Sequence, residues 1–280
     1  MTWNIVVDSS SDLLSTADGE NVQLTVAPLR ILVGEQEFVD NETMDVDALL
    51  GAMAKERTAS SSACPSLDAF AKAYEKADCS VCFTISNALS GSYNSAVTAR
   101  EMVLEEYPDK QICVIDSKGT AGTIVLLAQR AKAILEKNPD IDPQDLFAQM
   151  RDYQASLRLV FTLECFDNLV KNGRMRPLVG NLLKTLGIHI VAEATLQGEI
   201  NVTGKARGAV KTYQNMIDHM KTCKDCTGAK VVINHCKNYD GAEKLAKMME
   251  DQLPIAGVEL MECRGLTSYY AMEKGIIVGY

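Results

Sequence analysis

The residues best suited to bind an anionic group lie in a loop, residues 86–92, which contains Ser90 and Gly91. An apolar run typical of a buried strand precedes it at residues 81–85, and apolar residues at helical spacing follow it. Hydroxyls and the free backbone N–H groups of a helix N-terminus can together hold a carboxylate or a phosphate. Serine is also a common helix N-cap, so for Ser90 and Ser92 taken alone capping is the simpler interpretation.

Two further apolar runs end in similar polar loops. Residues 3–8 lead through Asp8 into three consecutive serines, and residues 111–116 lead through Asp116 into a Gly-containing loop. Because the carboxyl ends of parallel strands meet at one edge of a sheet, the three loops are predicted to lie together, where α/β proteins bind ligands. Asp8 and Asp116 could hold Mg²⁺ there, but Asx-type hydrogen bonds to the loop backbone are the simpler expectation.

The order of the predicted elements favours an α/β fold with two domains. Strands and helices alternate at first, which predicts a parallel sheet with right-handed crossovers in an α/β/α N-terminal domain, residues 1–155. A hairpin around Gln197 and Gly198 then lies among further helices and strands. It favours a mixed sheet in an α/β C-terminal domain, residues 156–280.

The apolar spacing and the capping residues assign the individual elements. Asp45 and Ser66 are predicted N-caps, and residues 58–66 are a loop or a further ligand-facing segment. Helices are predicted at residues 45–57, 67–77, 93–107, 120–137, 145–155, 164–171, within 173–187, 206–221 and 240–252. Strands are predicted at residues 3–8, 21–34 as one or two strands with a possible hairpin partner at 35–40, 81–85, 111–116, 157–163, 188–204 as a hairpin, 230–234 and 257–263.

Composition excludes several classes of protein. The chain has 280 residues, of which 47% are hydrophobic and 23% are charged, as in ordinary globular proteins. No apolar run approaches the roughly 18–20 residues of a membrane span, and no basic-then-apolar leader begins the chain, so a cytoplasmic protein without stable membrane insertion is expected. The net charge of −9 argues against a nucleic-acid-binding surface.

The nine cysteines are expected to be reduced and mostly buried. Cys223 and Cys226, together with His235 and Cys236, have residue types that could bind Zn²⁺. A second cysteine pair at metal-binding spacing is missing beside them, so unligated thiols are the simpler interpretation and no metal is expected.

Several segments together resemble the DegV family of fatty-acid-binding proteins, which includes the FakB subunits of bacterial fatty acid kinase. These segments are IVVDSSSDL (5–13), the loop ending in Pro65-Ser66, ISNALSGSYNSA (85–96), VIDSKGTAG (114–122), Gly173-Arg174 and Gly204-Lys205-Ala206-Arg207. The resemblance implies a two-domain protein that buries a long acyl chain and holds its carboxylate with hydroxyls. In the kinase systems, a separate ATP-binding subunit then phosphorylates that carboxylate to an acyl phosphate.

The resemblance also implies roles for individual residues. Ser90 is similar to the head-group hydroxyl, and Ser62 occupies the position where the family's Thr-Ser-x-Pro-Ser stretch begins. Gly91 would supply a backbone N–H to the carboxylate. Arg174 and Arg207 are expected to contact a phosphate or the partner subunit.

The chain departs from the family pattern at three places. Ser62 and Cys64 stand where the family has Thr and Gln, which keeps a hydroxyl but loses an amide. Asn172 replaces the usual Gly before the Gly-Arg pair, and residues 268–280 lack the family's Thr-His-Thr-Gly-Pro segment. Head-group recognition is therefore expected to differ in detail.

Three alternative functions remain open. A serine-dependent acyl hydrolase would use Ser90 as nucleophile, but G-x-S-x-G is absent and a base must come from His189, His219 or His235. His219 is expected to be solvated, His235 to be structural, and His189 to lie in a strand near the domain interface. A phosphotransferase would need a Walker A or GxGxxG stretch, which is absent, and an interaction module would not explain the loops.

The favoured prediction is a lipid-binding protein that is not an enzyme and needs no cofactor. Its ligand is a long-chain fatty acid, with the carboxylate held at Ser62 and Ser90.

Overall fold

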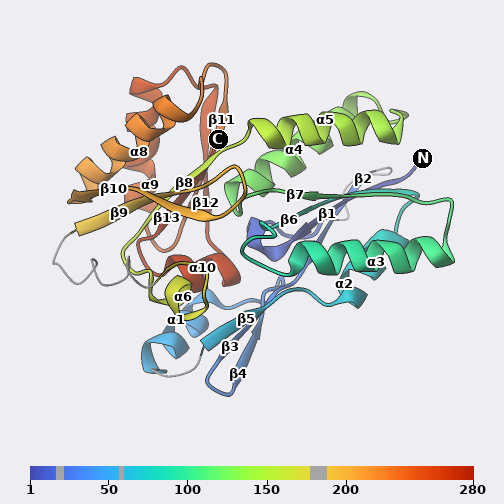
Figure 1. The fold of residues 1–280 in the computed structure, drawn as a ribbon, viewed down its shortest axis with the longest axis horizontal. Helices are drawn as coiled ribbons and strands as arrows, with labels where there is room; N and C mark the ends of the chain where they lie inside the picture. The colour runs from blue at the N-terminus through green and yellow to red at the C-terminus, as the bar shows by residue number, and fades with distance from the viewer. Residues whose placement is uncertain (17–21, 57–59, 177–187) are drawn as a thin grey trace.

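The computed structural model describes residues 1–16, 22–56, 60–176 and 188–280. It is an α/β fold built on a four-stranded parallel sheet, a six-stranded mixed sheet and a three-stranded antiparallel sheet (Figure 1). The parallel sheet lies in the N-terminal part of the chain and the mixed sheet in the C-terminal part, which confirms the predicted fold class. Within the described ranges, no helix combines the length and the apolar character that a membrane crossing requires.

The parallel sheet consists of short apolar runs. Its strands are β1 (Trp3–Asp8), β2 (Val22–Ala27), β6 (Cys79–Thr84) and β7 (Gln111–Asp116). Their order is β2-β1-β6-β7, and each neighbouring pair is parallel. β1 and β6 are buried along their whole length, as expected for strands whose two faces are both covered by helices.

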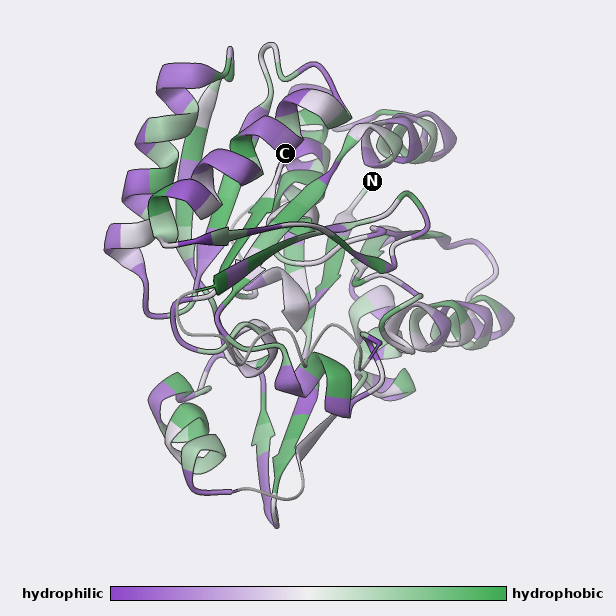
Figure 2. Cartoon of the chain, turned by 60° about the vertical axis from the view of Figure 1, so that its left-hand side comes forward, coloured by the Kyte–Doolittle hydropathy of each residue, from purple (hydrophilic) through white to green (hydrophobic). Residues whose placement is uncertain are grey.

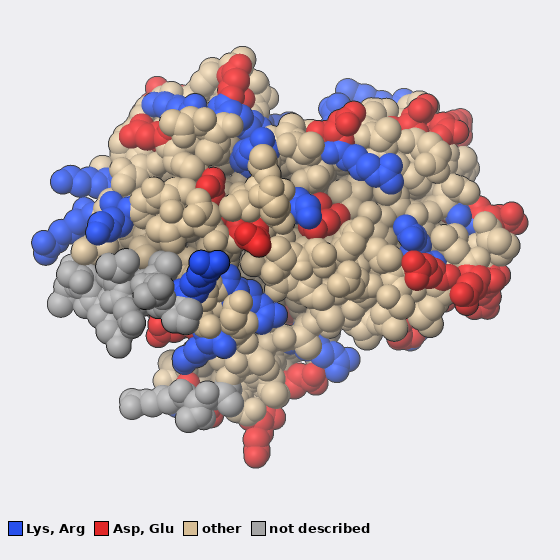
Figure 3. Space-filling view, viewed as in Figure 1, with Lys and Arg blue, Asp and Glu red and all other residues tan. Residues whose placement is uncertain are grey.

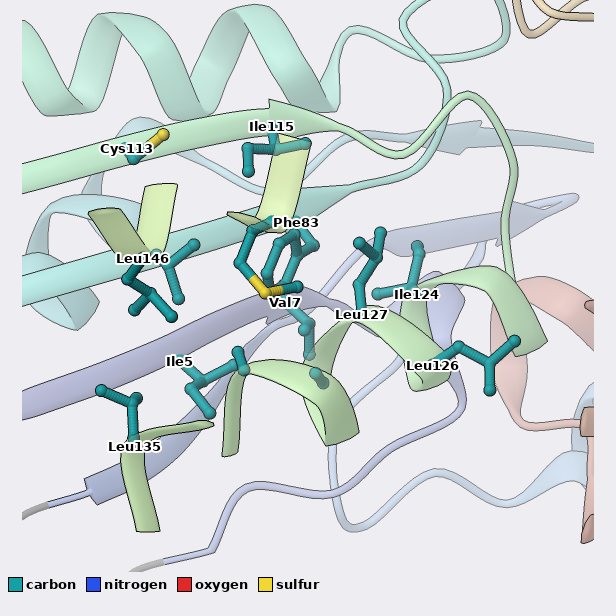
Figure 4. Packing of buried hydrophobic residues seen from close by; sticks show 14 of the residues in the cluster. Ile5, Val7, Phe83, Cys113, Ile115, Ile124, Leu126, Leu127, Leu135 and Leu146 are labelled. Atoms are coloured by element: carbon teal, nitrogen blue, oxygen red, sulfur yellow. The ribbon is translucent and has the colours of Figure 1, made fainter. Parts of the chain in front are cut away.

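Helices cover both faces of the parallel sheet (Figure 1). They are α2 (Leu67–Glu75), α3 (Ser92–Glu106), α4 (Gly122–Lys137) and α5 (Pro143–Ser156). Ile5 and Val7 of β1 pack with α4 and α5, whereas Val6 packs with α2 and α3, because alternate residues of a strand face opposite sides. Figure 4 shows the first cluster, where Leu127 and Phe83 lie between α4 and the sheet.

The mixed sheet has the strand order β10-β9-β8-β13-β11-β12. Its strands are β8 (Leu159–Leu163), β9 (Ile188–Ala194), β10 (Ile200–Arg207), β11 (Lys230–His235), β12 (Gly257–Glu262) and β13 (Ile276–Gly279). α8 (Ala209–Cys223) and α9 (Tyr239–Gln252) cover one face. Figure 2 shows hydrophilic outer surfaces on the helices and largely hydrophobic strands inside them.

The antiparallel sheet has the order β4-β3-β5 and lies below the other two in Figure 1. Its strands are β3 (Arg30–Val33), β4 (Gln36–Val39) and β5 (Ser60–Ala63). It shares an apolar cluster with α1 (Val46–Lys55) and α10 (Gly265–Ala271). The predicted hairpin is confirmed, as are the N-caps Asp45 and Ser66, whose side chains accept the N–H groups of Ala48 and Ala69.

Some predicted boundaries are wrong. β10 continues to Arg207, which the prediction put in a helix; Gly208, with φ of +84°, separates this strand from α8. Residues 60–63, predicted as part of a loop or of a further ligand-facing segment, pair with β3 as β5. Of the helix predicted within 173–187, residues 177–187 lie outside the described part of the chain.

α4 joins the parallel sheet to the mixed sheet. Gly122, the first residue of α4, lies so close to β13 that a Cβ added to Gly279 would come within 2.4 Å of the Gly122 carbonyl carbon. Val232 of β11 belongs to the same apolar cluster as α4. The division of the chain into residues 1–155 and 156–280 stays a prediction.

Candidate ligand-binding site

A cavity of about 310 Å³ lies between the loops at the carboxyl edge of the parallel sheet and the mixed sheet. Ligand pockets span about 300–1,000 Å³, so its size suits a slender molecule. One part of its wall is apolar and comes from the mixed sheet, α6 (Asp167–Lys171) and α10. This apolar wall consists of Leu159, Phe161, Leu163, Leu169, Ala194, Ile200, Leu266, Ala271 and Ile277.

The polar part of the cavity is formed by β5, the loop after β6 and Arg174. The Ser62 hydroxyl lies 2.8 Å from the Tyr270 hydroxyl of α10. Arg174 Nε donates to the Leu89 carbonyl, which fixes the guanidinium beside Ser90. A hydroxyl pair uses one of its two protons internally, so one proton remains for a ligand oxygen.

Ser90 and Gly91 line the cavity at the N-terminus of α3. Gly91 is the N-cap residue and offers no side chain, and the Ser90 hydroxyl accepts the N–H of Ser92 at 3.3 Å. A Cβ on Gly91 would lie 3.5 Å from the sulfur of Cys64, the residue that follows β5, so the end of β5 and this loop approach closely. The positive end of a helix dipole beside hydroxyl donors favours a carboxylate or a phosphate.

Asp8 holds this loop in place. Its carboxylate accepts the Ser92 hydroxyl at 2.5 Å, the Ile85 N–H at 2.9 Å and the Ser10 hydroxyl at 2.5 Å. Burial raises the pKa of Asp8, and these donors oppose that effect. Asp116 similarly accepts the N–H of Asn87 in the loop after β6 and the N–H of Lys118 in the loop after β7, so the predicted Asx-type role of both carboxylates is confirmed.

A second carboxylate cluster joins the first loop to α10. Asp12 accepts the Arg264 N–H at 2.7 Å, the Asn234 amide at 2.7 Å and the Thr267 hydroxyl. Burial raises the pKa of Asp12 to about 7, although those donors lower it. Asp40 accepts the first N–H groups of α10. Both carboxylates therefore hold the element that carries Tyr270.

Four of the five predicted site residues line the cavity: Ser62, Ser90, Gly91 and Arg174. Arg207 does not; it is exposed on β10. Sequence reasoning missed Tyr270, and the aromatic pair at 269 and 270 was the one local signal for it.

All three histidines lie away from the residues that line the cavity in the described part of the chain. None of His189, His219 and His235 is among the residues that line it. His235 is buried, contacts Tyr239, and has a pKa lowered by burial. The expectation of a solvated His219 is wrong, because Glu193 of the neighbouring strand β9 lies 2.9 Å from its Nε2 atom.

The considered set of Cys223, Cys226, His235 and Cys236 does not come together among the described residues. Of these four, only Cys223 lies in a cluster whose ligand atoms are close enough to share a metal ion. The Cys226 thiol donates to the Lys224 carbonyl instead. All nine cysteines are free, as predicted.

Taken together, the fold and the cavity define an α/β protein that can enclose an amphipathic ligand with an anionic head group. A model of the DegV family, described as uncharacterised proteins, matches residues 2–273. A DegV domain-containing protein of Streptococcus gordonii is 34% identical over 281 residues, which cover 100% of this chain and 99% of the relative. The chain belongs to the DegV family, which confirms the resemblance.

Solved structures of relatives contain fatty acids. The Streptococcus pneumoniae fatty acid kinase (Fak) B3 protein, loaded with linoleic acid, has a TM-score of 0.95 and 33% identity, covering 100% of this chain and 99% of its own. A DegV family protein of Eubacterium eligens, loaded with heptadecanoic acid, has a TM-score of 0.93 and 29% identity, covering 99% of both chains.

Proposed function

We propose that this protein binds a long-chain fatty acid, with the acyl chain along the apolar wall and the carboxylate held by Ser62, Ser90 and the Gly91 N–H. The observation that carries the proposal is the cavity, which is apolar at the mixed sheet and lined by hydroxyls at the N-terminus of α3. Each buried methylene contributes about 0.8 kcal/mol, and the donors offset the cost of desolvating the carboxylate. The fatty acids in the related structures support the same ligand class.

The protein would act as a binding subunit rather than as an enzyme. Acyl hydrolysis by Ser90 needs a general base, and no histidine lines the cavity. Arg174 at the cavity and the exposed Arg207 would contact the phosphate or an ATP-binding kinase subunit. Figure 3 shows Lys and Arg side chains over α6 and β5 and at the outer edge of β9 and β10, which suits an acidic partner surface.

Native mass spectrometry of the protein purified from a bacterial host, followed by denaturing extraction, tests the ligand class. One fatty acid per chain is expected. A ligand-free mass that also takes up no added oleate would overturn the proposal.

Calorimetric titration of the delipidated protein with oleate tests the head-group assignment. Ser90→Ala should weaken binding by about 1–3 kcal/mol, or roughly 5- to 150-fold, because one donor to a buried charge is lost. The methyl ester of oleate lacks that charge, so the same substitution should change its affinity much less. Ser156→Ala, whose hydroxyl donates to the Tyr153 carbonyl outside the cavity, is the control. Equal losses for oleate and its ester would refute carboxylate recognition by Ser90.

Presentation to a kinase has a separate test. The oleate-loaded protein, mixed with ATP and the ATP-binding subunit of a bacterial fatty acid kinase, should yield an acyl phosphate that hydroxylamine traps as the hydroxamate. Arg207→Ala should slow this reaction without changing the oleate dissociation constant. If the wild-type protein binds oleate but yields no acyl phosphate, fatty acid binding stays supported and the kinase role is refuted.

A further inference from the structure

Three side chains converge on one point behind the mixed sheet, on the face away from the cavity. His219 Nε2 lies 2.9 Å from Glu193 Oε2 and 3.3 Å from Cys223 Sγ, and the sulfur lies 4.0 Å from the same carboxylate oxygen. His219 and Cys223 are four residues apart on α8, so they share one face of the helix. Glu193 precedes Ala194, which lines the cavity, and the strand alternation turns its side chain to the other side.

The three groups already contact one another through hydrogen bonds. The His219 Nε2 atom lies between the Glu193 carboxylate and the Cys223 sulfur, and the thiol donates to the same carboxylate oxygen at 4.0 Å. A cation at the centre of the three atoms would replace these hydrogen bonds, because an imidazole nitrogen, a thiolate and a carboxylate oxygen each offer it a lone pair.

The spacing of the three atoms suits a tetrahedral metal ion. Zinc bonds of about 2.0–2.3 Å at tetrahedral angles separate the ligand atoms by roughly 3.3–3.7 Å. The observed separations of 2.9, 3.3 and 4.0 Å bracket that range, so movements of about half an ångström complete the geometry. The His219 and Glu193 side chains are 19% and 22% exposed, which leaves a path for the ion and for a fourth ligand such as water.

An outer contact orients the carboxylate. Asn201 of β10, opposite Glu193 in the strand register, donates its amide to Glu193 Oε1 at 2.9 Å. That bond occupies one carboxylate oxygen and directs the other, Oε2, at the histidine and the thiol. Outer-shell hydrogen bonds of this kind fix metal ligands in place.

We propose that Glu193, His219 and Cys223 form a binding site for a divalent cation of the zinc type, which links β9 to α8. The two anionic ligands would neutralise a doubly charged ion, and the thiolate with the imidazole selects Zn²⁺ over Mg²⁺ or Ca²⁺. The site is independent of the fatty acid proposal.

Titration of the reduced, metal-free protein with Co²⁺ tests the site, because a thiolate ligand gives cobalt an intense charge-transfer absorbance band. We expect the protein to bind one Co²⁺ per chain and to show the charge-transfer band. Zn²⁺ added in an amount equal to the Co²⁺ should displace the cobalt and remove the band. Cys223→Ser should abolish the band, and His219→Gln should weaken Co²⁺ binding more than about a hundredfold. Asn201→Ala, an exposed substitution that touches no ligand atom of the ion, should weaken it roughly tenfold.

Cys165→Ser and His189→Gln are the matched controls, since they remove another partly buried thiol and another imidazole, both outside the trio. Both should retain the band and the affinity. Circular dichroism of each variant without metal checks its fold. A protein that takes up no Co²⁺, or a band that survives Cys223→Ser, would overturn the proposal.

Discussion

At the scale of single residues, Tyr270 decides how Ser62 can serve a ligand. Their hydroxyls lie 2.8 Å apart, and burial raises the pKa of the phenol, so the phenol remains protonated. Tyr270→Phe leaves the Ser62 hydroxyl without its partner. We expect oleate to bind about 0.5–1.5 kcal/mol more weakly, or roughly 2- to 12-fold, as judged by calorimetry.

The matched control is Tyr239→Phe, because this tyrosine is exposed on α9 and does not line the cavity. Its oleate affinity should equal that of the wild type. Unchanged affinity in Tyr270→Phe would show that Ser62 is positioned without the phenol.

Asp12 makes stability depend on pH. Its pKa of about 7 in the folded protein exceeds the ordinary value of 3.8, so between these values the folded state holds a proton that the unfolded state releases. The contribution of the protonated Asp12 to the free energy of unfolding is complete below about pH 4 and is lost as the pH rises to 7. From pH 5 to 8 the free energy of unfolding should fall, relative to that of Asp12→Asn, by roughly 2–3 kcal/mol.

Urea unfolding at pH 5 and pH 8 measures this difference. Asn234 Oδ1 is buried and has no hydrogen-bond partner among the described residues, so a rotated Asn234 amide could accept from the new amide in Asp12→Asn. Asp251→Asn, at an exposed position of α9, is the control and should show no such pH effect. If the wild type gains free energy of unfolding relative to Asp12→Asn between pH 5 and pH 8, the raised pKa of Asp12 is contradicted.

At the scale of elements, the contact between α4 and β13 leaves no room for a side chain. In Gly279→Ala the new methyl group would lie 2.4–2.5 Å from the backbone of Gly122 and Thr123, so one element must move. We expect a loss of about 1–3 kcal/mol in the free energy of unfolding, measured by urea denaturation.

Gly51→Ala is the matched control for this substitution. Gly51 lies in α1, and no atom of the described residues comes within 4 Å of an added Cβ, so alanine should stabilise the helix by about 0.5–1 kcal/mol. Equal effects of the two substitutions would show that backbone entropy, not the close contact, governs Gly279.

The end of β9 borders a second pocket. Ala194 and Leu159 line both this pocket and the cavity, so they separate the two. Ala194→Phe should fill the apolar end of the cavity and shift the extracted fatty acids toward shorter chains, as read by mass spectrometry. An unchanged chain-length profile would place the end of the acyl chain elsewhere.

Local patterns predicted the loops well, because a strand, its terminal polar residues and the next helix follow one another in the chain. Ser90 and Gly91 lie at the cavity for that reason, whereas Ser62 and Arg174 were placed there by the resemblance to the DegV family. The contact of His219 with Glu193 could not be predicted, since Glu193 lies on strand β9, 26 residues away from His219 in helix α8. β13 was not predicted either, because it has only four residues and is stabilised by pairing with β11 and β8 on either side.

The sequence also gave no signal for α10, whose residues are almost all buried and show no amphipathic period. Its N-terminus is fixed by Asp40 and Asp12, which come from segments more than 200 residues earlier. Tyr270 therefore escaped prediction, because its place at the cavity depends on contacts distant in the chain.

At the scale of the whole molecule, the cavity is shared by both parts of the chain, so a ligand should stabilise them together. Oleate at a hundred times its dissociation constant should add about 2.7 kcal/mol and raise the thermal midpoint by roughly 5–10 °C. Hydrogen exchange should slow both in the loop after β6 and in β8. Slowing in one part alone would mean that the ligand does not bridge them.

The position of β13 has a consequence for synthesis on the ribosome. This strand lies between β8 and β11, yet it follows every other strand of its sheet in the chain. Until it emerges from the exit tunnel, β8 with its hairpin and β11 with β12 carry open edges where unrelated chains can pair. The mixed sheet can therefore form as a whole only after β13 has been translated. We expect nascent chains halted before Ile276 to depend most on chaperones.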